Sequence, residues 1–243
     1  MNVTEQQIRE NYLAVLERIR LAAIKVGRNP KEIQLVVVSK SQPVEVLLAA
    51  YQAGIRIFGE NYPQETEEKI KLLTQLEGIQ WHMIGHLQSR KAPIIAKYFS
   101  KMHSVDSLYI TEKIEKELTK TGRMLSVLLE LNLASEQTKS GWEVKEEADL
   151  EELAKQIKVI TSFPHIKLDG LMTMPPLFAE VEKVRPYFRK LGEIQRQLQE
   201  MLHGLQLREL SMGTSADYEI AVQEGATLVR IGQAILGARI MKG

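Results

Sequence analysis

Short apolar runs alternate along this chain with longer segments in which apolar residues recur every three or four positions. The short runs predict strands at residues 35–40, 55–59, 80–85, 101–105, 124–131, 166–172, 209–212 and 227–230. The longer segments predict helices at residues 43–53, 63–76, 92–98, 108–118, 148–160, 181–202, 217–223 and 233–236. One more helix should precede the first strand, because Thr4 and Gln7 have capping-box spacing and residues 27–30 form a stop signal.

The order of these elements predicts the fold. Strands that are each followed by a helix are typical of a parallel sheet. Eight such units within 243 residues fit a closed (β/α)8 barrel of the TIM type, and a doubly wound open sheet is the alternative. No glycine-rich linker or shift in composition divides the chain, so residues 1–243 are expected to form a single domain with an N-terminal helix.

Composition narrows the choice of partners. The 32 basic and 31 acidic residues leave a net charge of +1, so the chain carries no strong field for nucleic acid or an anionic membrane. Cysteine is absent, which excludes disulfides, a thiol nucleophile and a Cys-ligated metal. The polar N-terminus does not resemble a signal peptide, and the apolar runs are too short to cross a bilayer. We therefore expect a cytoplasmic protein without a metal, nucleic acid or membrane partner.

Lys40 ends the first predicted strand, which is apolar and β-branched. A lysine in apolar surroundings has a lowered pKa, so its neutral amine can form a Schiff base with a carbonyl. A lysine at a strand end can also extend its ammonium into water along its own stem. In a (β/α)8 barrel the active site lies at the carboxyl ends of the strands, where Lys40 falls, and this favours the chemical role.

Two later segments have the features of a phosphate site. Residues 211–217 (SMGTSAD) lead from the seventh strand into a helix and offer hydroxyls and backbone N–H groups to an anion. Gly232, after the eighth strand, would let a ligand approach the backbone. These two loops form the usual phosphate site of the barrel, although Ser215 could instead be a plain helix cap.

A lysine and a phosphate cradle at one barrel mouth suggest a single ligand, pyridoxal 5′-phosphate (PLP), which has an aldehyde at one end and a phosphate at the other. Arg230 would lie between them, near the pyridine nitrogen. A guanidinium can only donate a hydrogen bond, so the nitrogen would stay largely unprotonated and the ring would be a poor electron sink. The alternative for Arg230 is an ordinary ion pair at the strand end.

Six stretches, in order across almost the whole chain, resemble the PLP homeostasis protein family, also called the YggS/PROSC family. They are residues 37–40 (VVSK), 58–65 (FGENYPQE), 81–91 (WHMIGHLQSRK), 170–174 (GLMTM), 210–217 (LSMGTSAD) and 229–232 (VRIG). The resemblance implies a barrel like the N-terminal domain of alanine racemases, with PLP on Lys40. It also implies a role in supplying, storing or buffering PLP, with no established turnover.

The resemblance also implies which residues surround PLP. Asn61 would lie near the ring hydroxyl and Arg230 at the ring nitrogen, and Val38 and Met212 would pack around the ring. The phosphate cradle would consist of Ser211, Thr214, Ser215 and Gly232. The chain departs from the family twice. Thr214 replaces the usual Met and adds a hydroxyl beside the phosphate, and Arg90 replaces the usual Asn, which puts any role carried over for that position in doubt.

Three functions are compatible with these residues: a PLP carrier, a PLP-dependent racemase, and a barrel enzyme that acts on a phosphorylated sugar through Lys40. A racemase needs a base on each face of the substrate. The fold-related racemases take the second base from another domain of a partner subunit, and this chain ends at Gly243, soon after the eighth strand. We therefore expect a monomeric carrier whose partners are PLP and also PLP-dependent apoenzymes or a regulatory protein.

Two further features have no assigned chemistry. His82 and His86 have a spacing that suits a metal only on a helix, and here they straddle a strand end, so a structural or ring-side role is predicted. Residues 134–142 form the longest polar break and are predicted to be a flap over the site.

Overall fold

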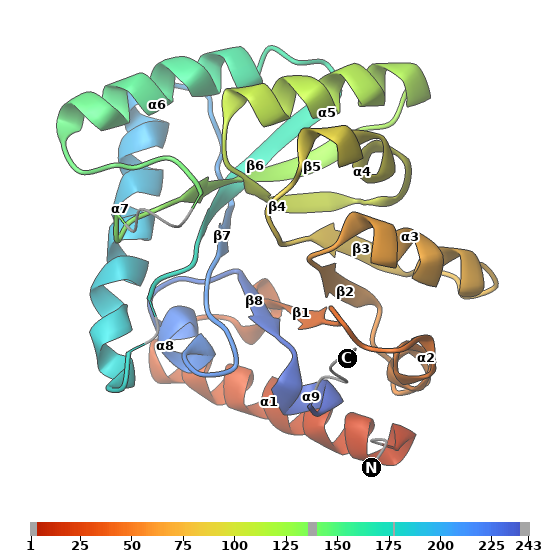
Figure 1. Cartoon of the computed structure of the whole chain (residues 1–243). Helices are drawn as coiled ribbons and strands as arrows, with labels where there is room; N and C mark the ends of the chain where they lie inside the picture. The colour runs from red at the N-terminus through yellow and green to blue at the C-terminus, as the bar shows by residue number, and fades with distance from the viewer. Residues whose placement is uncertain (1–3, 136–139, 177, 239–243) are drawn as a thin grey trace.

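The computed structural model describes residues 4–135, 140–176 and 178–238. Its eight parallel strands form a closed barrel in sequence order, because the last strand pairs with the first (Figure 1). The strands are β1 (Gln34–Val38), β2 (Ile57–Glu60), β3 (Gln80–Met83), β4 (Lys101–Val105), β5 (Leu125–Leu131), β6 (Ile166–Thr173), β7 (Glu209–Ser211) and β8 (Leu228–Ile231). The predicted (β/α)8 barrel is therefore confirmed, and the open sheet is wrong.

Helices surround the strands. They are α1 (Glu5–Lys25), α2 (Val44–Gln52), α3 (Pro63–Leu72), α4 (Ala92–Tyr98), α5 (Leu108–Thr121), α6 (Glu147–Ile160), α7 (Arg185–Met201), α8 (Tyr218–Gln223) and α9 (Gln233–Leu236). The segment predicted as one helix over 181–202 begins as a 3-10 turn, η3 (Val181–Val184), before α7. Among the described residues, no helix combines the length and the apolar character that a membrane crossing requires.

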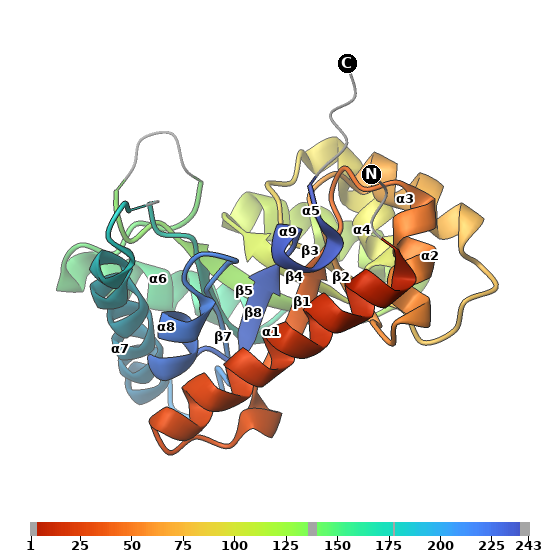
Figure 2. The same cartoon turned by 90° about the horizontal axis from the view of Figure 1, so that it is seen from below.

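The N-terminal helix α1 runs along the outside of the barrel, past α8 and α9 (Figure 2). Its first turn forms as the sequence predicts, because the Thr4 side chain accepts a hydrogen bond from the backbone N–H of Gln7 at 3.2 Å. Its buried face joins the core between the helices and the barrel wall.

Side chains alternate along each strand and so divide the apolar residues into two cores. A small inner core fills the barrel and contains Val36, Leu128, Met172 and Leu228. A much larger outer core lies between the strands and the helices, and it includes Val37 and other residues that face away from the barrel axis. The alternation means that each residue at the barrel mouth belongs either to the interior or to the outer layer.

Candidate cofactor site at the barrel mouth

The residues predicted to bind a cofactor follow four neighbouring strands. Strand β7 pairs with β8, β8 with β1, and β1 with β2. The carboxyl ends of these strands carry the segments 38–40, 61, 211–215 and 230–232. The fold therefore brings these predicted residues to one arc of the barrel mouth.

Lys40 lies beyond the end of its strand, not within it. Strand β1 ends at Val38, and Lys40 is a half-buried residue in the turn that follows. The next residue, Ser41, has φ 57°, a left-handed backbone conformation that is uncommon for residues other than glycine. The predicted strand was two residues too long, because the sharp turn at Ser41 contains no glycine to mark it.

Gly232 is a glycine because two strands approach closely. A Cβ atom at this position would lie 2.9 Å from the carbonyl oxygen of Val38 and 3.2 Å from the Val38 Cβ. Val38 itself is half-buried at the end of β1. The structure shows that Gly232 approaches the end of the neighbouring strand β1, and the approach of a ligand to its backbone stays a prediction.

Asn61 carries a buried acceptor next to the strand end of β2. Its Oδ1 atom is buried and has no hydrogen-bond partner among the described residues. The backbone and Cβ of Asn61 pack so tightly against Gly85 that a Cβ at Gly85 would lie 2.8–2.9 Å from them. An unsatisfied buried acceptor costs about 1–3 kcal/mol, so a group that donates a hydrogen bond to Asn61 would be favoured here.

Arg230 points into the barrel and is almost completely buried, with 4% of its surface exposed. It donates one hydrogen bond to the Ser211 hydroxyl and a second to the Thr173 carbonyl oxygen at 3.1 Å. Burial lowers the pKa of Arg230 to about 10, and the nearby carboxylates of Glu130 and Asp217 oppose that shift. The guanidinium is therefore a fixed cation at neutral pH.

Behind Arg230, a chain of hydrogen bonds crosses the barrel interior. The Ser211 hydroxyl lies 2.7 Å from His103 Nδ1, and His103 Nε2 lies 3.0 Å from His82 Nδ1. Burial lowers the pKa of both histidines, that of His82 to about 3, so both rings are neutral. The Ser211 hydroxyl oxygen accepts a hydrogen bond from Arg230, so the hydroxyl hydrogen of Ser211 can be donated to His103 Nδ1. His103 then carries its own hydrogen on Nε2 and donates it to His82 Nδ1.

This chain places the Ser211 hydroxyl differently from the sequence prediction. Ser211 has no exposed surface, and its hydroxyl is bonded inside the barrel instead of facing a phosphate. Its neighbour Met212 is also fully buried and belongs to the outer core, because it faces the side of the wall opposite to Ser211. We therefore leave Met212 out of the proposed ring contacts.

The loop after β7 is held by Asp217. The Asp217 carboxylate accepts hydrogen bonds from the Thr214 backbone N–H at 2.6 Å and from the Thr214 hydroxyl at 3.0 Å. Gly213 provides the turn with φ 92°. Thr214 is thus engaged with a carboxylate, whereas Ser215 is exposed at the mouth. Of the predicted cradle hydroxyls, Ser215 is the one that the structure leaves exposed to an anion.

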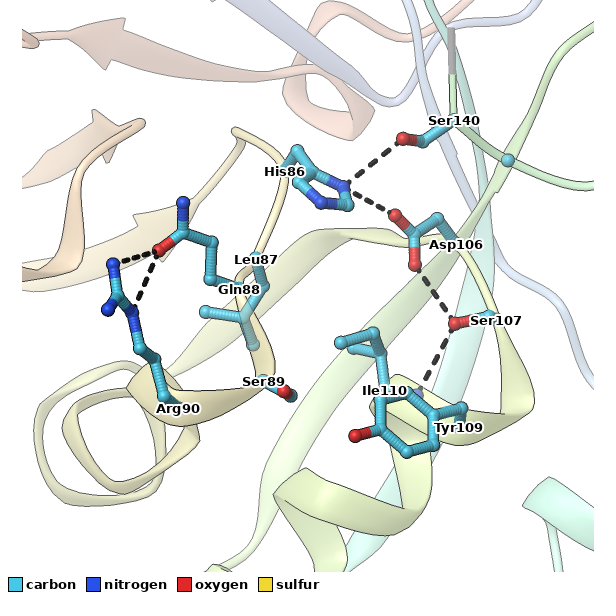
Figure 3. A pocket seen from close by; sticks show the side chains of 11 residues that line it. His86, Leu87, Gln88, Ser89, Arg90, Asp106, Ser107, Tyr109, Ile110 and Ser140 are labelled. Atoms are coloured by element: carbon cyan, nitrogen blue, oxygen red, sulfur yellow. Dashed lines mark hydrogen bonds and ion pairs between the residues drawn. The ribbon is translucent and has the colours of Figure 1, made fainter.

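A separate cavity of about 750 Å³ opens over the ends of β3 and β4 (Figure 3). His86 Nδ1 lies 2.7 Å from the Asp106 carboxylate and 3.2 Å from the Ser140 hydroxyl. Arg90 lines the same cavity and donates to the Gln88 side chain at 3.0 and 3.1 Å. His82 lies inside the barrel and His86 on the exposed rim, so they do not form a metal site.

Residues 136–139 of the predicted flap lie outside the described residues. The end of that loop is attached to β5, because Trp142 exchanges backbone hydrogen bonds with Asn132 and Glu130, both at 2.9 Å. Ser140 and Gly141 line the cavity beside His86. The part of the loop that is described therefore borders the mouth, and its movement stays a prediction.

A buried ionic cluster, which the sequence analysis missed, lies behind the Lys40 turn. The Lys69 ammonium of α3 lies 2.7 Å from Glu60, 2.6 Å from Glu65 and 2.9 Å from the Ser39 carbonyl oxygen. The Lys69 side chain is 4% exposed and that of Glu60 is completely buried. A lysine within a charged helix indicates a solvent-facing residue, so nothing in the sequence pattern marked this one.

Known proteins are similar in sequence to this chain over almost its whole length. Residues 8–240 match the family described as "Alanine racemase, N-terminal domain". Proteins named "Pyridoxal phosphate homeostasis protein" from Aquifex aeolicus and Escherichia coli K12 are each 38% identical, over 95% and 96% of this chain and 97% of their own length. The chain belongs to the pyridoxal phosphate homeostasis protein family. The family resemblance predicted from the sequence motifs is thereby confirmed.

Solved structures agree with the family assignment. PipY of Synechococcus elongatus, determined with PLP bound, is 34% identical over 92% of this chain and the whole of its own, with a TM-score of 0.79. An alanine racemase of Clostridium difficile has a TM-score of 0.71 but only 17% identity, and the match covers 57% of that chain. This second likeness shows that the chain shares a barrel fold with the racemase.

Proposed function

We propose that this protein binds PLP covalently through Lys40 and takes part in PLP homeostasis as a carrier or buffer. Membership of the pyridoxal phosphate homeostasis protein family and the PLP-bound structure of PipY support this proposal. The observation that carries it in this chain is the joint placement of Lys40 and the buried, cationic Arg230 on neighbouring strands at one barrel mouth.

The residues at the mouth fit PLP. PLP supplies an aldehyde that condenses with a primary amine, an acidic ring hydroxyl, a ring nitrogen and a phosphate. Lys40 would provide the amine. Asn61 would use its buried, unpartnered Oδ1 to accept a hydrogen bond from the ring hydroxyl. Ser215 and the backbone around Gly232 would hold the phosphate, and Val38 would border the ring.

Arg230 would donate a hydrogen bond to the ring nitrogen. Its pKa of about 10 keeps the guanidinium protonated at neutral pH, so Arg230 would not transfer its proton to that nitrogen. A ring nitrogen that is not protonated withdraws less electron density from the reacting carbon. This arrangement favours holding PLP over catalysing reactions on it.

Under this proposal the protein passes PLP to PLP-dependent apoenzymes, acts in the cytoplasm as a monomer and performs no catalytic turnover. The racemase alternative is not favoured, because the relatives that match almost the whole chain are named pyridoxal phosphate homeostasis proteins, whereas the racemase match is only 17% identical. An amino-acid racemase also needs a second base opposite Lys40.

The experiment that tests the proposal follows covalent binding. Incubation with PLP followed by borohydride reduction should add one pyridoxyl phosphate to the peptide that contains Lys40, as read by mass spectrometry. Lys40→Ala should remove both the adduct and the yellow colour, whereas the control Lys97→Ala, at an exposed lysine, should keep both. Wild-type protein without an adduct at Lys40 would refute the proposal. Exchange of amino-acid α-protons in deuterium oxide at about 1 per second or faster would refute the carrier role in favour of an enzyme.

A further inference from the structure

The residues on both sides of Lys40 are bonded to one buried ionic cluster. Ser39 donates its hydroxyl to Glu60 at 2.7 Å and offers its carbonyl oxygen to the Lys69 ammonium at 2.9 Å. Ser41 donates its backbone N–H to Glu65 at 2.9 Å. The backbone of Lys40 is thus held before and after its Cα by groups from β2 and α3.

The cluster surrounds one cation, and the other oxygen of the Glu60 carboxylate, Oε2, is buried without a hydrogen-bond partner among the described residues. An ammonium has three donors, and those of Lys69 have three acceptors: Glu60, Glu65 and the Ser39 carbonyl. Glu60 is completely buried, and Glu65 is 25% exposed. Charged groups are costly to bury, and buried ionic groups can be retained because they fix one conformation. Here the contacts of the cluster hold the turn between Ser39 and Ser41.

That turn needs to be held. Ser41 has φ 57°, which costs energy for a residue with a side chain and persists where the surroundings impose it. The Glu65 Oε1 atom accepts the Ser41 N–H at 2.9 Å and also contacts the Lys69 ammonium at 2.6 Å, so Glu65 links the turn to the buried cation. If the turn relaxed, the backbone that directs the Lys40 side chain would rotate.

The cluster lies outside the barrel wall. Ser39 and Glu60 alternate with Val38 and Gly59, and a Cβ at Gly59 would touch Val36 of the inner core. Glu60 therefore faces α3, on the far side of the wall from the barrel interior. From that side it can hold the Lys40 turn without occupying the cofactor site.

We propose that Glu65 and Lys69 are positioning residues that set the direction of the Lys40 amine for covalent attachment of PLP. The inference rests on the proposed function, since it concerns the same lysine. The Lys40 amine attacks the aldehyde carbon of PLP, and water leaves as the carbon–nitrogen double bond forms. Glu65 and Lys69 touch neither reactant; they hold the turn from which the amine extends. Misplacement of a reacting group by about 1 Å can slow a reaction on the order of a hundredfold.

The test compares substitutions on α3. Glu65→Leu removes the acceptor for Ser41, whereas Glu65→Gln keeps an oxygen that can accept from Ser41 and Lys69. Glu67→Leu is the matched control, because Glu67 is 28% exposed, similar to Glu65, and pairs with the solvent-exposed Lys71 instead of the Lys40 turn. The rate of PLP attachment, read by absorbance and confirmed by mass spectrometry, should fall about tenfold or more in Glu65→Leu. It should stay within about twofold of wild type in Glu65→Gln and Glu67→Leu.

A second readout does not require PLP. Hydrogen exchange of the Ser41 amide should accelerate in ligand-free Glu65→Leu, while the amides of β5 keep their protection and report an intact barrel. Folded Glu65→Leu with wild-type attachment rate and wild-type exchange at Ser41 would overturn the inference. Failure of the wild-type protein to form any adduct would instead refute the proposed function, so the two failures are distinct.

Discussion

The Lys69→Met substitution gives the sharpest test of how the site is built. Methionine keeps most of the side-chain volume but removes the ammonium, which leaves the fully buried Glu60 without its cation. Removal of one partner of a buried ion pair costs about 3–5 kcal/mol, because the remaining charge stays buried and uncompensated. This is a large part of the about 5–15 kcal/mol that stabilises an ordinary domain.

The loss should depend on pH in a defined direction. Burial raises the pKa of Glu60 above the ordinary value of 4.5 for a glutamate, and Lys69 partly opposes that rise. Without Lys69 the folded-state pKa should rise further. A carboxyl whose folded pKa exceeds its unfolded pKa loses stability as pH rises through the folded pKa, since the folded state holds its proton longer. The cost of Lys69→Met should therefore be greatest at neutral pH and shrink as pH falls toward about 4.5.

Urea unfolding of wild type and variant across this pH range measures the difference directly. Lys71→Met is the control, because Lys71 is 61% exposed and its pair with Glu67 should contribute less than about 1 kcal/mol. The reasoning fails if Lys69→Met costs no more than Lys71→Met at neutral pH. It also fails if the cost of Lys69→Met is the same at every pH.

Two further predictions concern the barrel interior and the mouth. The pKa of His82 lies near 3, below its unfolded value of 6.5, so the neutral ring contributes stability that is lost as pH falls from about 6.5 toward 3. His82→Gln should make the free energy of unfolding less dependent on pH in that window, and an unchanged pH dependence in urea unfolding would contradict this. Gly232→Ala should cost about 1–3 kcal/mol and weaken PLP binding, because the new methyl would lie 2.9 Å from the Val38 carbonyl oxygen. Gly192→Ala is the control, since its Cβ would make only an ordinary contact at 3.9 Å, and equal melting temperatures and PLP titrations for the two alanine variants would count against this account.

The barrel could be predicted from the sequence because the hydrophobic pattern of each segment indicates a strand or a helix, and the order of these elements along the chain indicates the fold. The predicted helix over 92–98 and strand over 101–105 agree with α4 and β4 residue for residue. The predicted end of the first strand is wrong where the chain turns sharply. Strand β1 ends at Val38, and Ser41 soon after it has a left-handed backbone conformation that no glycine in the sequence indicates. Backbone strain of this kind is imposed by tertiary contacts, so a local pattern does not reveal it.

The site could be predicted only in part. The sequence predicts that Lys40 and Arg230 share one barrel mouth, and the structure places them on the neighbouring strand ends of β1 and β8, whereas their contacts with PLP stay a prediction. The inward direction of Ser211 was missed, because β7 has three residues and its alternation is too short to read from the sequence. Lys69 was missed because its partners come from β1, β2 and α3, and only the packing of that helix on the wall joins them.

The two groups that would hold PLP are fixed from opposite sides of the same wall. Arg230 is held inside the barrel by Ser211 and the Thr173 carbonyl, whereas the Lys40 turn is held outside it by Lys69 and its carboxylates. The two networks share no residue, and most of their members are buried, with Glu65 partly exposed at 25%. A pocket whose two anchoring groups are each fixed in advance loses little conformational freedom when a ligand binds. Such preorganisation would strengthen the binding of PLP, because less of the interaction energy is spent on ordering the two anchoring groups.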